Sequence, residues 1–139
     1  MDLAPLSSQN HILNFRVNYG DTDSGGVMYY GRYPYVLECG RTEYLRDFAR
    51  PVSDLEKDPG MLFVVRKMNV EYLKSAFYDD LLTITSRIIK LTPVRILFAH
   101  EVLREGIVIN RSEVELASIS IKTKRPFKMT REFRDDLFS

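Results

Sequence analysis

The sequence contains little cysteine, histidine or tryptophan: 139 residues include one cysteine, two histidines and no tryptophan. Because Cys39 has no second cysteine to pair with, an internal disulfide is excluded, and we expect a reducing, cytoplasmic setting. The two histidines, His11 and His100, lie far apart and belong to no Cys/His cluster, so we expect no metal site. The net charge is only +1, with acids and bases interleaved, so nothing indicates a nucleic-acid partner.

Long hydrophobic runs are also missing. No window approaches the roughly 20 apolar residues of a membrane span, and the N-terminus lacks the basic-then-apolar pattern of a signal peptide. We therefore expect no membrane insertion, and we interpret Leu3–Gln9 as a short tether. The length predicts a single domain over residues 1–139.

One long helical pattern stands out, directly after an acidic loop that carries two adjacent glycines. Pro34 predicts that this helix begins near residues 31–34, and Pro51 predicts that it ends by that point. The apolar stripe contains a glycine, which we expect to permit close approach of another element. The stripe residues are Tyr33, Leu37, Gly40, Tyr44 and Phe48; the charged residues Arg32, Arg41, Arg46, Asp47 and Arg50 are expected to be solvated.

The remaining periodicity is that of strands. Residues 11–19 alternate as a half-buried strand, with His11 expected near an exposed end, whereas 52–60 is polar and predicts a loop. Four more strands are predicted, with bends or bulges in the two longest, and a short helix over 130–138. Short connections predict an antiparallel meander, on which His100 is expected to be a hydrogen-bonded core residue. The four predicted strands are Leu62–Leu73, Leu81–Leu91, Val94–Arg104 and Ile107–Thr123.

This order of elements predicts an α+β fold in which one antiparallel sheet packs against one helix. The opposite face of the sheet and its edges would remain uncovered. We therefore expect an oligomer.

Chemistry is indicated where the acidic loop meets the helix. The backbone N–H groups of residues 29–32 should lack intrahelical partners, and a helix N-terminus stabilises negative charge. Asp23 lies a few residues upstream, on a loop that Gly25 and Gly26 allow to fold back. A carboxylate beside an oxyanion-binding helix start is what ester or thioester hydrolysis needs. An ordinary turn, in which Asp23 only caps the loop, remains the alternative.

Several segments resemble a known family in the same order along the chain. The segment VNYGDTDSGGVMYYGRY (17–33), Glu38 and the segment RTEYLR (41–46) resemble the signature of hotdog-fold acyl-CoA thioesterases. The branch is that of the bacterial 4-hydroxybenzoyl-CoA thioesterases and the Tol-Pal-associated (YbgC-like) acyl-CoA thioesterases. The stretches VEYLKSAFYDDLL (70–82) and KRPF (124–127) match more loosely.

The resemblance implies a hotdog fold, with a five-stranded antiparallel sheet wrapped around one long central helix. It implies homodimers with active sites at the subunit interface, often paired into tetramers, and no cofactor beyond the CoA of the substrate. It carries the catalytic carboxylate to Asp23 and the oxyanion-binding amide to Tyr30, and it makes Asp21 structural.

Tyr30 also bears on the substrate. Many Tol-Pal-associated members have histidine there and the 4-hydroxybenzoyl-CoA type has an aromatic residue, which favours an aromatic acyl-CoA. Thioesterases for 1,4-dihydroxy-2-naphthoyl-CoA, in quinone biosynthesis, are similar; the enediyne polyketide group lacks the aspartate. A short-chain acyl-CoA or acyl-carrier-protein thioesterase and a non-catalytic acyl-CoA-binding module remain alternatives.

Further residues are candidates for substrate contact. Glu38 would order water or touch the substrate, with an ion pair to Arg41 equally open. Basic residues are candidates for the CoA phosphates, with ordinary solvated surface as the default alternative. The acyl-pocket candidates are Met28, Tyr29 and Tyr33; those expected from a neighbouring subunit are Phe63, Val64, Val65 and Arg66; the basic ones are Lys74, Lys122, Lys124 and Arg125.

Overall fold

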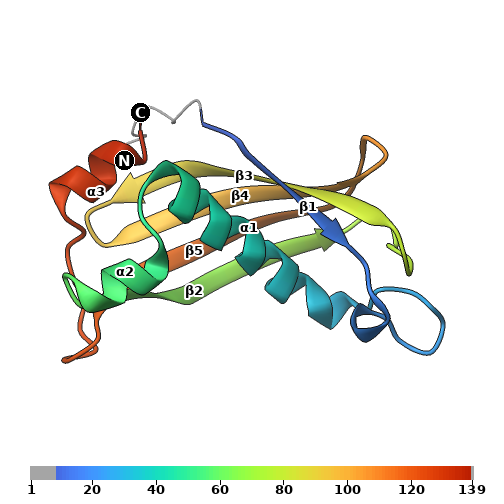
Figure 1. Ribbon diagram of the computed structural model, residues 1–139, viewed down its shortest axis with the longest axis horizontal. Helices are drawn as coiled ribbons and strands as arrows, with labels where there is room; N and C mark the ends of the chain where they lie inside the picture. Colours follow the sequence, from blue (N-terminus) through green and yellow to red (C-terminus); the bar gives the residue numbers. More distant parts are fainter. Residues whose placement is uncertain (1–8, 139) are drawn as a thin grey trace.

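The computed structural model describes residues 9–138, so the tether expected over Leu3–Gln9 lies outside the described residues except for Gln9. Within these described residues, five strands, three α-helices and two 3₁₀ turns follow one another (Figure 1). The strands are β1 (His11–Arg16), β2 (Met61–Tyr72), β3 (Leu81–Thr92), β4 (Arg95–Arg104) and β5 (Ile107–Ser120). The helices are α1 (Tyr33–Phe48), α2 (Val52–Lys57) and α3 (Arg131–Asp136), and the 3₁₀ turns are Tyr19–Asp21 and Tyr30–Arg32.

The strands form one antiparallel sheet in the order β1-β3-β4-β5-β2. The predicted meander is correct for β3, β4 and β5 but wrong for β2, which pairs with β5 at the far edge. The connection over 73–80 takes the chain back to the other side of the sheet, and loop length alone did not distinguish the two paths. The bulges expected in the long strands are confirmed. In β2 the register shifts between Val65 and Lys67, and in β5 it shifts at Ile109, which has no partner on β4.

Helix α1 runs diagonally across one face of the sheet (Figure 1). It begins where Pro34 predicted, with the proline in its first turn. The glycine in its apolar stripe permits the close approach that was expected: a Cβ on Gly40 would lie 2.7 Å from Ser86 Oγ and 3.0 Å from Ile84 Cγ2. The sequence thus placed the helix and its sheet-facing side correctly.

A buried polar layer crosses the core beneath this glycine. His100 of β4 is 1% exposed, as predicted for a core histidine; its Nδ1 lies 2.9 Å from Ser86 Oγ and its Nε2 3.4 Å from Arg41 Nη1. Arg41 was expected to be solvated, and this was wrong, because its side chain turns inward and is only 5% exposed. Burial lowers the pKa of Arg41 to about 10, and burial together with Arg41 lowers the pKa of His100 to about 3.

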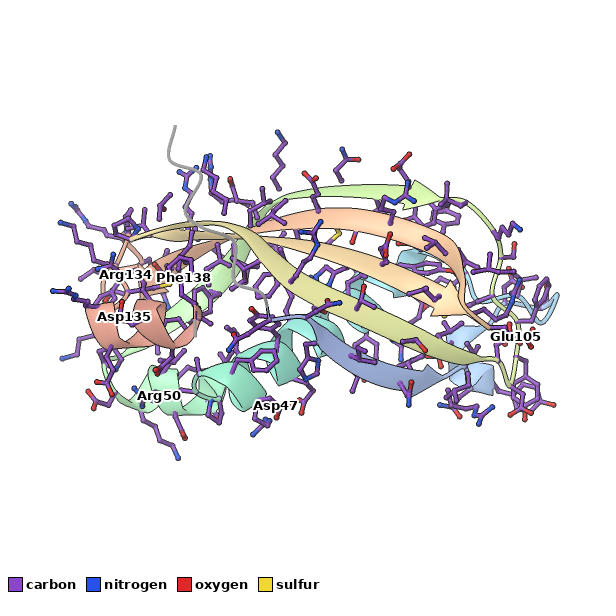
Figure 2. All side chains as sticks on the ribbon, turned by 90° about the horizontal axis from the view of Figure 1, so that it is seen from above. Asp47, Arg50, Glu105, Arg134, Asp135 and Phe138 are labelled. Atoms are coloured by element: carbon purple, nitrogen blue, oxygen red, sulfur yellow. The ribbon has the colours of Figure 1, made fainter. Side chains whose placement is uncertain are left out.

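This polar layer separates two apolar clusters. The cluster beside α2 and α3, which we call the α3 half, contains Tyr44, Leu55, Phe98 and Phe133. The cluster beside the acidic loop, which we call the loop half, contains Met28, Tyr33, Val36 and Leu82. Figure 2 shows the two ends: Arg134 and Phe138 lie at one, and Glu105 of the β4–β5 turn lies at the other.

Two further predictions were wrong. Residues 52–60 were expected to be a loop, but they include α2, which places Leu55 in the core at 1% exposure. His11 was expected to be exposed, but it is 7% exposed and its Nε2 lies 2.7 Å from the Asp47 carboxylate. In both cases a non-local contact decides the outcome, since Asp47 lies on α1 and Leu55 packs against other elements of the α3 half. The expected C-terminal helix is confirmed as α3.

Candidate active site

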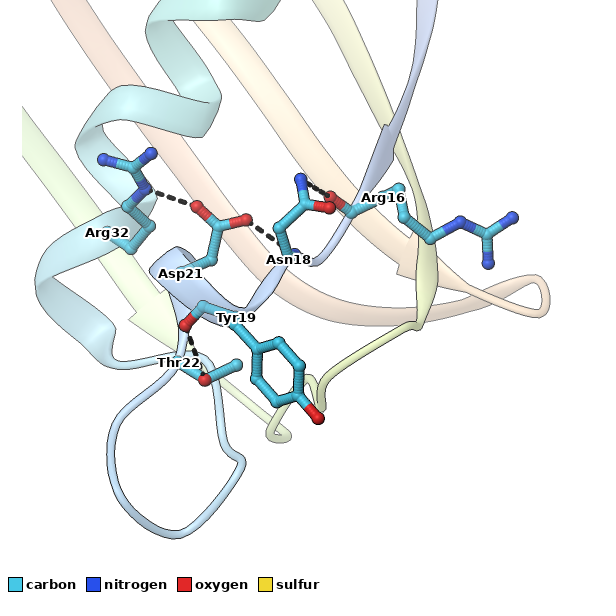
Figure 3. Close-up of polar contacts among 6 residues, drawn as sticks. All are labelled: Arg16, Asn18, Tyr19, Asp21, Thr22 and Arg32. Carbon is cyan, nitrogen blue, oxygen red and sulfur yellow. Dashed lines mark hydrogen bonds and ion pairs between the residues drawn. The ribbon is translucent and has the colours of Figure 1, made fainter.

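The first aspartate of the acidic loop is fixed on both sides. The Asp21 side chain is 4% exposed; its Oδ2 accepts from Asn18 N–H at 2.8 Å and its Oδ1 accepts from Arg32 Nε at 2.7 Å (Figure 3). Arg32 also lies over the Tyr35 ring, 4.1 Å from its centroid, and the hydrogen bond that Arg32 donates to Asp21 raises the pKa of Arg32. Both carboxylate oxygens of Asp21 therefore accept hydrogen bonds, and the one from Arg32 holds the loop to the start of α1.

The second aspartate is held only by its own turn. Asp23 N–H donates to Val27 O at 2.9 Å, and Gly26 N–H donates to Asp23 O at 3.1 Å, with Gly26 at a φ of +77° that favours glycine. The Asp23 carboxylate is exposed and accepts a single hydrogen bond within residues 9–138, from Gly25 N–H at 2.9 Å. The Asp23 carboxylate thus keeps acceptor capacity that Asp21 has lost.

The entrance to α1 supplies free amides. The chain makes a 3₁₀ turn over Tyr30–Arg32 before the α-helix begins. In the described part of the chain, the N–H groups of Tyr30 and Gly31 donate to no backbone or side-chain acceptor, whereas the Arg32 N–H donates to Tyr29 O at 3.0 Å. Two unpaired N–H groups at the positive end of a helix dipole can hold a developing oxyanion.

Asp23 and Tyr30 both line one cavity of about 530 Å³. It is lined by both predicted catalytic residues and by four of the predicted substrate-binding residues. The lining residues are Asp23, Val27, Met28, Tyr29, Tyr30, Tyr33, Tyr72, Leu73, Lys74 and Ser75. The structure therefore brings Asp23, the free-amide residue Tyr30 and a mostly apolar wall together, while the catalytic roles of Asp23 and Tyr30 remain predictions.

Three tyrosine rings shape the inner wall of the cavity. The Tyr72 ring meets Tyr33 edge-on at 5.5 Å and Tyr30 at 6.0 Å between centroids, and its hydroxyl donates to Tyr30 O at 3.4 Å. Burial raises the pKa of Tyr33 to about 12, so the Tyr33 hydroxyl is protonated at neutral pH. Sequence reasoning missed Tyr72, although the stretch 70–82 that carries part of the resemblance contains it.

The other predicted contact residues do not line this cavity. Glu38, Phe63 and Val65 border a separate cavity of about 140 Å³ between α1 and β2, and Arg66 pairs with Glu115 at 3.0 Å. Val64 is 38% exposed on the edge strand β2, whereas Lys122, Lys124 and Arg125 follow β5 at the α3 end. The alternative ion pair of Glu38 with Arg41 is not among the ion pairs of residues 9–138, since Arg41 faces His100.

Residues 9–138 contain no group of three or more His, Cys, Asp and Glu residues arranged to hold a metal ion. Within the same range, no helix is both long enough and apolar enough to cross a membrane.

Comparison with known proteins gives consistent results. The family model of the thioesterase-like superfamily matches residues 17–137. The acyl-CoA thioesterase YbgC of Haemophilus influenzae is 31% identical over 119 residues, which cover 86% of this chain and 88% of that protein. A probable thioesterase from Bartonella henselae superimposes with a TM-score of 0.83 at 33% identity, covering 88% of this chain and all of that one. A DHNA-CoA thioesterase from Staphylococcus aureus superimposes with a TM-score of 0.84 at 29% identity, covering 91% of this chain and 85% of that one.

Proposed function

The chain belongs to the thioesterase-like superfamily, and from this premise we propose that it hydrolyses an aromatic acyl-CoA thioester in the cavity of Asp23 and Tyr30. Its fold is the hotdog fold and its activity is that of a thioester hydrolase. The observation that supports the site is that Asp23, whose carboxylate accepts one hydrogen bond within residues 9–138, and Tyr30, whose N–H is free there, line the same cavity. The Asp23 carboxylate does cap its own turn through the Gly25 N–H, as the sequence alternative expected, and its second oxygen accepts no hydrogen bond within residues 9–138.

The chemistry follows from these groups. The thioester carbonyl oxygen accepts a hydrogen bond from the Tyr30 N–H, which stabilises the tetrahedral oxyanion by about 3 kcal/mol. The Asp23 carboxylate either attacks the carbonyl carbon and expels the CoA thiolate, giving an anhydride that water hydrolyses, or removes a proton from an attacking water. In both routes the C–S bond breaks, the thiolate takes up a proton, and the products are a free acid and CoA.

The aromatic wall supports an aromatic acyl group. Aromatic rings prefer edge-to-face and offset-stacked partners, and Tyr29, Tyr30, Tyr33 and Tyr72 all line the cavity. One relative is named a DHNA-CoA thioesterase, which fits an aryl substrate such as 1,4-dihydroxy-2-naphthoyl-CoA or 4-hydroxybenzoyl-CoA and a place in quinone biosynthesis. A second candidate is a short-chain acyl-CoA substrate, because the aliphatic side chains of Val27, Met28 and Leu73 also line the cavity and can contact an alkyl group.

A second copy of the chain is part of the proposal. Strand β2 is an edge of the sheet, and Val64 and Val65 on it are 38% and 50% exposed. Pairing of this edge with another protomer would cover them and could bring Phe63, Arg66, Lys124 and Arg125 to a neighbouring cavity. We place the assembly at a homodimer or a dimer of dimers, and the protein in the cytoplasm on the basis of its single cysteine.

The test is thiol release from a panel of aryl- and alkyl-CoAs, with acyl-carrier-protein substrates included. We expect Asp23→Asn to lower kcat at least about 100-fold on the best substrate with an unchanged Tm. Asp79→Asn is a matched control, because this exposed aspartate has a φ of +71° that asparagine tolerates and does not line the cavity. A fully active Asp23→Asn enzyme would exclude the assigned site, and binding of acyl-CoAs without turnover would favour the non-catalytic module.

A further inference from the structure

We propose that Tyr72 is a positioning and specificity-determining residue of this site, a role that rests on the proposed function. Its hydroxyl fixes the peptide at the oxyanion-binding turn, and its ring forms the surface against which an aromatic acyl group packs. The two roles belong to different atoms of one side chain, so they can be separated by substitution.

The backbone holds Tyr72 in a fixed position at the end of β2. It pairs with Asn110 of β5, and the two following amides, Leu73 N–H and Lys74 N–H, donate to Ile109 O at 2.9 and 3.0 Å. Asn110 is fully buried. The ring therefore stands on a well-paired strand end rather than on a mobile loop, which is what a positioning group requires.

The hydroxyl acts on the turn at the start of α1. The Tyr30 carbonyl accepts from Tyr72 Oη at 3.4 Å and also from the Tyr33 N–H that closes the 3₁₀ turn. Anchoring this carbonyl restrains the backbone of Tyr30, which lines the cavity and whose own N–H donates to no acceptor within residues 9–138. The Tyr72 hydroxyl thus holds the turn that carries the Tyr30 N–H assigned to the oxyanion.

The ring acts on the acyl group. It is packed edge-on against Tyr33, which is 3% exposed, yet Tyr72 itself is 50% exposed, so part of the ring faces the cavity. An aromatic acyl group gains an aromatic pair interaction there beyond the area it buries, whereas an alkyl group gains only the buried area. The ring should therefore favour aryl over alkyl thioesters by roughly threefold to tenfold in kcat/KM.

Two variants separate these roles, assayed with benzoyl-CoA and hexanoyl-CoA. Tyr72→Phe removes only the hydroxyl, and we expect kcat to fall about threefold to tenfold on both substrates with little change in KM. Tyr72→Leu also removes the ring, and we expect the benzoyl-to-hexanoyl ratio of kcat/KM, which Tyr72→Phe leaves unchanged, to fall by a factor of roughly three to ten. A substrate ratio that is retained in Tyr72→Phe and lost in Tyr72→Leu, with kcat lowered in both variants, is a result that a merely structural role would not give.

Tyr78 provides the matched control. It is 43% exposed, stacks on Tyr19 with 4.0 Å between centroids, and does not line the cavity. Tyr78→Phe and Tyr78→Leu should leave both kcat and the substrate ratio at wild-type values. If Tyr72→Leu does not fold, Tyr72→Ile, a better strand former, makes the same test.

The outcomes are distinct. A wild-type kcat in Tyr72→Phe, or a change in KM alone, would overturn the positioning role. An unchanged substrate ratio in Tyr72→Leu would overturn the specificity role. If the wild-type chain releases thiol from no thioester, the proposed function fails together with this inference, whereas turnover by the wild type with unaffected Tyr72 variants refutes the inference alone.

Discussion

The two halves of the molecule use the same residue types in opposite ways. In the α3 half, Tyr44 is fully buried and packs edge-on against Phe98 at 5.2 Å. In the loop half, Tyr30 is 75% exposed and lines an open cavity. Large apolar surface left exposed usually marks a binding site, whereas buried aromatic area stabilises the fold. We infer that the α3 half provides most of the stability and that the loop half is free to provide the chemistry.

The loop half repeats this division on a smaller scale. Asp21 and Asp23 are two residues apart. The Asp21 carboxylate is buried and accepts two hydrogen bonds, whereas the Asp23 carboxylate is exposed and accepts one within residues 9–138. The arginine at the start of α1 makes the difference, because Arg32 is committed to Asp21 at 2.7 Å. Two identical side chains therefore take separate tasks, one holding the loop and the other remaining available to react.

The largest effect on stability should come from the α3 half. Phe98 is fully buried, so Phe98→Ala should lower the free energy of unfolding by about 3–5 kcal/mol, through lost burial and a residual cavity. At a temperature where the variant is folded, its kcat should equal that of the wild type. Urea unfolding and thiol release measure the two quantities.

Tyr29→Leu supplies the converse comparison in the loop half. Tyr29 lines the cavity and is 40% exposed, so its loss should change the free energy of unfolding by less than about 1 kcal/mol while lowering kcat/KM. A Phe98→Ala enzyme whose kcat falls while it is fully folded would show that the two halves are not independent.

How far the sequence predicts this molecule depends on how local each signal is. Pro34, the apolar stripe of α1 and the alternation of the strands lie within single elements, so the fold class and the element limits could be predicted. Asp23 and Tyr30 are seven residues apart at one helix start, so their meeting in one cavity could also be anticipated.

The failures involve residues whose partners are far along the chain. Arg41 and His100 are 59 positions apart, and His11 and Asp47 are 36 apart. Periodicity within a single element does not reveal such distant partners, so it assigned Arg41 and His11 to the surface. Tyr72 reaches Tyr30 across 42 positions, and sequence reasoning did not find that contact. Helix α2 is too short for its pattern to be recognised, with Leu55 as its one buried residue.

A smaller effect is expected at the boundary between the halves. Gly40→Ala should lower the free energy of unfolding by about 1–2 kcal/mol, because overpacking against Ser86 Oγ and Ile84 Cγ2 outweighs the roughly 1 kcal/mol that alanine gains in a helix. Gly20→Ala is the matched control: nothing lies within 4 Å of its added methyl group, so we expect a change within about 0.5 kcal/mol. Equal stabilities of the two variants would refute the close approach of α1 to the sheet, and thermal unfolding measures both.

The smallest effect is a pH dependence at the same boundary. The pKa of His100 is about 3 in the folded chain, against an ordinary value near 6.5, because burial and Arg41 disfavour the charged imidazole. Below about pH 6.5 the unfolded chain therefore binds a proton that the folded chain does not, so stability falls as the pH falls. This histidine alone should remove about 1 kcal/mol between pH 7 and pH 5.5. Urea unfolding of the wild type and His100→Gln at both pH values isolates it, since every other group titrates in both proteins. The variant should lose about 1 kcal/mol less than the wild type over this interval, and parallel losses would show that His100 is not the neutral group that divides the two halves.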